Sequence, residues 1–122
     1  MSAKLREIAG FRVLDYTDSA QRLESERDAT TLIGDALGNG ADCLIVPVSS
    51  ISAEFFKLRL GLAGAITQKF VNYGGKLAII GDVSHHIAAS TALRDFVTEA
   101  NRGKQLWFLP STDEFEERLS RQ

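Results

Sequence analysis

The chain has 122 residues, of which 44% are hydrophobic and 25% are charged, values ordinary for a soluble globular protein. This length predicts one domain, spanning residues 1–122, with a single core. The formal net charge of -2 argues against a nucleic-acid partner held by counterion release. No apolar run approaches the roughly 18 residues that span a bilayer, and the N-terminus lacks the core of a signal peptide. We therefore expect no nucleic-acid partner, no membrane partner and a cytoplasmic location, which the single cysteine, Cys43, also fits because it excludes an intramolecular disulfide.

The first forty residues predict a hairpin followed by a helix. Two short candidate strands, at residues 5–8 and 11–16, flank an Ala-Gly turn. The polar and charged residues 17–28 then indicate a solvated connection. Asp28 is a candidate N-cap for a helix over residues 29–37, because apolar side chains recur there at helical spacing.

The middle of the chain predicts a strand–helix–strand crossover. Residues 43–46 and 76–80 are uninterrupted aliphatic runs, typical of strands that are covered on both faces. Between them, residues 53–73 predict a long helix. Gly61 and Gly64 lie one turn apart in it, and since glycine inside a helix costs about 1 kcal/mol against alanine, we expect them to allow close approach to a neighbouring backbone.

The last forty residues predict one more strand–helix unit. Residues 83–90 indicate a loop or irregular lead-in, and residues 91–101 predict a helix whose cap is Ser90 or Thr91. Residues 105–109 then predict the last strand.

A short C-terminal helix follows a capping-box pattern. Ser111 and Glu114 stand three residues apart, as the cap and its reciprocal partner do, and Phe115 and Leu119 turn inward. Three strand–helix units after a hairpin predict a small α/β domain. Its sheet of four to five strands is mostly parallel, with right-handed crossovers and helices packed on it.

Several segments together resemble an uncharacterised bacterial family, domain-of-unknown-function family 4180. The resemblance covers about two-thirds of the chain and implies no established activity. The matching segments are Phe55-Phe56, Leu58, Gly61-Leu62-Ala63-Gly64, Gln68 through Tyr73, Ala78-Ile79-Ile80-Gly81-Asp82, Phe96-Val97 and Glu99-Ala100-Asn101-Arg102-Gly103.

The predicted order of elements also resembles the STAS domains of anti-sigma-factor antagonists. In that group, a serine or threonine after the third strand is often phosphorylated by a partner kinase, and the matching place holds Ser49, Ser50 and Ser52. The usual Asp-Ser-Ser-Gly or Asp-Ser-Thr-Gly motif is absent from this chain. The resemblance therefore implies a STAS-like fold more strongly than a phosphorylation switch.

The same three serines have two interpretations from the residues alone. Serines before a helix commonly cap its free amides. Alternatively, they bind a phosphate or another anion at the start of the helix. Glu54 stands in the first turn of the predicted helix, where a carboxylate is favourable with the helix dipole.

Adjacent histidines, His85 and His86, follow Asp82 at the carboxyl end of a predicted strand, where open α/β sheets place ligands. Three potential metal ligands within five residues suggest zinc, but adjacent histidines need unusual geometry to share one ion and no further cluster completes a site. We expect surface histidines, with no metal and no cofactor.

A basic and aromatic edge begins the predicted long helix. Phe55 and Phe56 stand beside Lys57 and Arg59. Either the rings pack into the core under the stems of the basic residues, or they stay partly exposed and anchor a protein partner or a second copy of the chain.

The sequence contains no nucleophile elbow, no phosphate loop and no dinucleotide fingerprint. Our first hypothesis is a non-enzymatic regulatory or protein-interaction domain, of the anti-sigma-factor antagonist kind, that acts through residues 47–54 and the helix after them. Its partner would be a regulatory kinase or a second copy. The alternative is a small-molecule or anion-binding domain, or an enzyme, that uses Ser50, Asp82 and His85.

Overall fold

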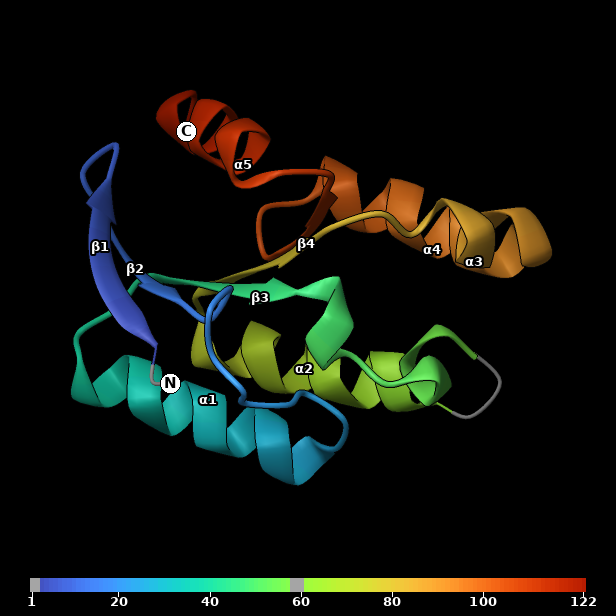
Figure 1. Ribbon diagram of the computed structural model, residues 1–122, viewed down its shortest axis with the longest axis horizontal. Helices are drawn as coiled ribbons and strands as arrows, with labels where there is room; N and C mark the ends of the chain where they lie inside the picture. Colours follow the sequence, from blue (N-terminus) through green and yellow to red (C-terminus); the bar gives the residue numbers. More distant parts are fainter. Residues whose placement is uncertain (1–2, 58–60) are drawn as a thin grey trace.

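A computed structural model describes residues 3–57 and 61–122 (Figure 1). It contains a five-stranded sheet in the order β1-β2-β3-β4-β5. The first two strands pair antiparallel and the other neighbours pair parallel. The predicted α/β class, the N-terminal hairpin and the mostly parallel sheet are confirmed. The strands are β1 (Lys4–Ile8), β2 (Phe11–Asp15), β3 (Cys43–Pro47), β4 (Lys76–Ile80) and β5 (Leu106–Leu109).

Helices cover both faces of this sheet. Figure 1 shows α1 and α2 side by side on one face and α5 on the opposite face. Buried side chains of α4 join the core on the α1 and α2 face. The helices are α1 (Glu26–Gly38), α2 (Leu62–Tyr73), α3 (Ser84–Ala89), α4 (Thr91–Arg102) and α5 (Thr112–Ser120), with two short 3-10 turns, η1 (Val48–Ser50) and η2 (Ala53–Phe56).

The alternation of side chains along the strands divides the core in two. Leu44 in β3 and its neighbours in register, Leu14 and Leu77, face α1, α2 and α4. The residues between them, such as Ile45 and its register partner Ala78, face α5. A central strand thus buries both faces, which explains why β3 and β4 are continuous aliphatic runs.

The first helix begins earlier than predicted. Its N-cap is Ser25, whose hydroxyl accepts from the Asp28 amide at 3.1 Å. The Asp28 carboxylate instead accepts from the amide of Glu24 at 2.8 Å, so the prediction that Asp28 caps the helix is wrong. The connection before α1 is also less solvated than expected, because Leu23 is fully buried.

The long helix predicted for residues 53–73 is two elements. Residues 53–56 form η2, and α2 starts only at Leu62, after Gly61 with a left-handed φ of 74°. The predicted helical residues 58–60 lie outside the described residues. The packing role predicted for the two glycines is wrong, because a Cβ added at Gly61 or Gly64 would meet no atom within 4 Å. Instead, α2 packs on the sheet through larger side chains: Ala63, Ile66 and Phe70.

The C-terminal half follows the prediction except at one helix. Ser90 caps α4 and Ser111 caps α5, each hydroxyl accepting from an amide three residues on. The segment predicted as a loop at 83–90 contains α3. None of the residues of α3 is buried, so it shows no apolar periodicity that would reveal it.

Candidate functional site

The carboxyl ends of β3 and β4 lie against each other at one edge of the sheet. Gly81, just after β4, has a φ of 139°, and a Cβ there would lie 2.9 Å from the Val48 side chain. Only glycine meets both conditions without strain. This contact brings the start of the β4–α3 connection close to η1.

A second segment fixes the loop after β3 from the other side. The Leu23 amide donates to the Ser50 carbonyl at 2.8 Å, and Leu23 forms a parallel bridge with Ile51. Arg22 donates from its guanidinium to the Ser49 carbonyl at 2.6 Å. Hydrogen bonds from the β2–α1 connection therefore hold the backbone of Ser49, Ser50 and Ile51 in place.

The three predicted serines occupy different environments. Ser49 is exposed, Ser50 is 4% exposed, and the Ser52 hydroxyl is buried with no hydrogen-bond partner among the described residues. The interpretation that these serines cap a helix is wrong, because η1, η2 and α2 have no side-chain cap. Glu54 is exposed in the first turn of η2.

A column of aromatic rings runs from the core to the surface at this edge. Buried Phe108 of β5 lies 6.4 Å from Phe55, centroid to centroid, and Phe55 lies 5.4 Å from Phe56. Phe56 stacks on His86 at 4.1 Å with an interplanar angle of 10°, and His86 contacts exposed His85 at 3.9 Å. Since both phenylalanines are buried, they pack as the first of the two sequence-based alternatives expects, and the column ends in imidazoles.

A hollow of about 530 Å³ opens beside the outer end of this column. Three alanines line it, and their methyl groups are too small to fill the space between η2 and the two helices α3 and α4. The lining residues are Ala53, Phe56, Lys57, His85, His86, Ala89, Ser90 and Ala92.

The charge of the hollow is low. Burial lowers the pKa of His86, and the neighbouring His85 lowers it further, so both favour the neutral form of the stacked imidazole. Lys57 is exposed and is the one lysine or arginine among the lining residues. The site therefore offers an aromatic and methyl surface beside a single permanent cation.

The predicted polar set does not converge on this hollow. His85 lines it, but Ser50 and Asp82 do not. The Asp82 carboxylate accepts from the Ser84 amide at 2.8 Å, and the hydrogen bonds from Ser84 hold its pKa below the ordinary value. Arg59 lies outside the described residues. Across residues 3–57 and 61–122, no group of three or more His, Cys, Asp or Glu side chains could hold a metal ion.

A larger hollow, of about 810 Å³, lies at the opposite edge of the sheet. Three of its polar side chains are already engaged, although Lys104 and Gln105 line it as well. Tyr73 donates its hydroxyl to the Ala41 carbonyl, Lys76 donates to the Lys104 carbonyl at 2.8 Å, and Asp42 accepts from a backbone amide at 3.0 Å. We therefore place the candidate site at the carboxyl edge, where the exposed imidazole and Lys57 face solvent.

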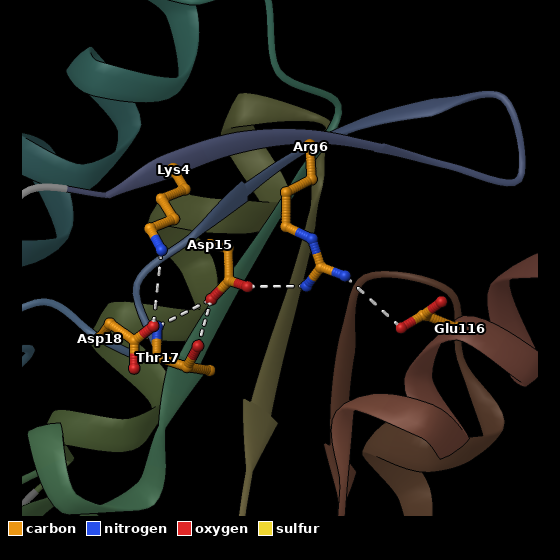
Figure 2. A network of polar contacts seen from close by, with 6 residues as sticks. All are labelled: Lys4, Arg6, Asp15, Thr17, Asp18 and Glu116. Carbon is orange, nitrogen blue, oxygen red and sulfur yellow. Dashed lines mark hydrogen bonds and ion pairs between the residues drawn. The ribbon is translucent and has the colours of Figure 1, made fainter.

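Sequence reasoning missed a partly buried ionic cluster on the α5 face (Figure 2). Asp15 is 8% exposed and accepts from the Thr17 amide at 2.8 Å, from its hydroxyl at 2.6 Å and from Arg6 at 2.8 Å. Arg6 also reaches Glu116 of α5 at 3.7 Å. Burial raises the pKa of Asp15, but these donors outweigh burial and hold it below the ordinary value. The only signal in the sequence was a carboxylate that directly follows the apolar pair Val13 and Leu14 in a predicted strand.

The comparisons with known proteins give a family and nothing further. A family model described as "Domain of unknown function (DUF4180)" matches residues 8–119. No curated protein and no solved structure matches the chain. Within the described part of the chain, no helix is both long and apolar enough to cross a membrane.

Proposed function

The chain belongs to the DUF4180 family, whose description names no activity, and we propose that it is a non-enzymatic binding domain for a protein partner. The observation that carries this proposal is the hollow at the carboxyl edge, where small side chains leave room beside the column of aromatic rings. Anchoring residues at protein interfaces fill pockets of this kind.

The lining suits one kind of anchor. An aromatic or large aliphatic side chain of the partner would contact the three alanine methyls and stack on the face of His85. A carboxylate next to that anchor would pair with exposed Lys57. The preferred partner segment therefore combines a bulky apolar residue with a neighbouring acidic one.

A small-molecule ligand is the weaker alternative. Ligand cavities of this size orient their ligand with a few convergent polar groups. Here Asp82 is occupied by Ser84, and Ser50 is buried outside the hollow. Shape and apolar contact are what the site provides, and these favour a side chain carried by a protein.

A regulatory kinase is one partner within this proposal. Of the three serines in the loop after β3, only Ser49 is exposed, so we propose Ser49 as the residue that a kinase would modify. A cytoplasmic location is likewise a proposal. It is supported by the single cysteine, Cys43, a buried free thiol of the kind that reducing compartments maintain.

Two neighbouring alanines of α3 provide the test. Ala89 lines the hollow, whereas Ala88 is also exposed but does not line it. A photo-crosslinking amino acid at Ala89, expressed in the native cell, should give a discrete protein adduct that the same group at Ala88 does not give. Identical adducts at both positions, in variants that fold normally, would count against the proposed surface. Phe56 is unsuitable for such a test, since it is 7% exposed and a polar substitution would disturb the core.

A further inference from the structure

A second apolar surface lies between α2 and α4, and it shares no lining residue with the hollow at the carboxyl edge. Whereas α1 packs directly against α2, a groove of about 250 Å³ separates α2 from α4. Val71 of α2 stands at this groove with 37% of its surface exposed, one of three large hydrophobic residues that the described chain exposes. Three further apolar residues line the groove: Phe96, Ala100 and Leu106.

Two opposite charges line the same groove. Glu99 of α4 is exposed and pairs only loosely with Arg102, at 3.6 Å between two largely exposed side chains. Lys104, in the α4–β5 connection, is exposed and has no acidic partner among the described residues. The surface thus presents an apolar residue, a shallow depression, one anion and one cation.

We propose that this groove binds a second copy of the chain, as an isologous dimer. In a twofold interface each patch faces itself, so a patch must carry both members of every charge pair. Glu99 can then meet Lys104 of the other copy twice, while each Val71 covers the apolar groove opposite. A partner of single charge sign would leave either Glu99 or Lys104 facing a like charge.

The edges of the sheet offer less for self-association. The Asn101 side chain accepts from the Phe108 amide at 2.7 Å and donates to the Phe108 carbonyl at 3.2 Å, so it occupies the outer edge of β5. The other edge strand, β1, carries Lys4 and Arg6, and edge lysines oppose strand-to-strand pairing. The groove on the helical face is therefore the surface that we assign to the second copy.

Charge reversal tests this assignment by light scattering over a concentration series. Wild type should approach twice its 13.3 kDa mass as concentration rises. Glu99→Lys and Lys104→Glu should each weaken dimerisation at least about tenfold, because each places like charges opposite one another twice. Mixing the two variants, or combining both changes in one chain, should restore the dimer, since opposite charges again face each other.

Controls separate this interface from a loss of folding or from a different face. Arg27→Glu, an exposed reversal on α1, should leave the dimer unchanged, and Val71→Arg should abolish it with unchanged circular dichroism. A wild-type chain that stays monomeric at every concentration overturns the proposal. That is the result expected if a helix of another protein occupies the groove instead. A dimer that neither single reversal weakens also overturns it.

Discussion

Replacing Asp15 with asparagine tests the partly buried ionic cluster that joins β1, β2 and α5. The carboxylate is 8% exposed and accepts three hydrogen bonds, two from Thr17 and one from Arg6 (Figure 2). An asparagine has nearly the same shape, keeps one acceptor oxygen and presents its amide to the guanidinium. The change therefore removes the charge and the Arg6 bond with little effect on packing.

The structure sets the size of the expected loss. Hydrogen bonds to charged groups contribute roughly 1.5–3 kcal/mol each, and Thr17 can still donate to the asparagine oxygen, so Asp15→Asn should lower the free energy of unfolding by about 2–3 kcal/mol. Asp18→Asn is the matched control. Its ion pair with Lys4 spans 3.9 Å between side chains that are 66% and 68% exposed, and it should cost less than about 0.5 kcal/mol.

The loss of stability caused by Asp15→Asn should also depend on pH, and the pKa of Asp15 sets the direction of that dependence. Although burial raises the pKa of Asp15, its hydrogen bonds outweigh burial and hold the folded-state pKa below 3.8. The charged form therefore stabilises the fold above about pH 4, and this contribution disappears as pH falls through the folded-state pKa. Urea unfolding followed by circular dichroism should show the difference between wild type and Asp15→Asn shrinking from pH 7 to pH 2.5. An equal cost for Asp18→Asn, or a difference that is the same at both pH values, would refute the reasoning.

Three further predictions concern single positions. Gly81→Ala should lower the free energy of unfolding in urea by about 1–3 kcal/mol, because Gly81 has a positive φ and lies against Val48. Gly64→Ala, at an exposed position of α2, should raise the free energy of unfolding by about 0.5–1 kcal/mol. Equal effects of the two substitutions would contradict this. Asn101→Leu should cost about 1–3 kcal/mol by thermal unfolding, since it leaves Phe108 unpaired at the β5 edge; an unchanged midpoint would refute it. Burial raises the pKa of Cys43 to about 12, so a thiol reagent at pH 8 should label it only in urea, and rapid labelling of the folded protein would show that the thiol is accessible.

The strands and most helix ends were predictable because their signals are local. The aliphatic runs of β3 and β4 and the caps at Ser90 and Ser111 depend on residues close together in the chain. The extent of the central helix was not predictable, because α2 begins only after Gly61, whose left-handed φ is not helical. Nor was α3 predictable, because none of its residues is fully buried and its sequence shows no apolar periodicity.

The candidate site was predictable only in part. His85 follows a predicted strand, and this position was enough to place it at the carboxyl edge of the sheet. Its role in binding stays a prediction. The hollow itself depends on alanines from three different elements, which no local pattern connects. The cluster around Asp15 needed the register of β1 against β2 to place Arg6 beside it. Side chains that meet only in the folded chain leave little trace in one sequence.

The most direct measurement of the proposed function is the affinity of a captured partner for two tryptophan variants. Ala89→Trp would fill the hollow with an indole, whereas Ala88→Trp adds the same bulk at a neighbouring exposed position outside it. By calorimetry, Ala89→Trp should weaken binding at least about a hundredfold and Ala88→Trp less than about threefold, as expected when an anchor loses its pocket. Equal affinities for the two folded variants would contradict a binding function at the carboxyl edge of this sheet.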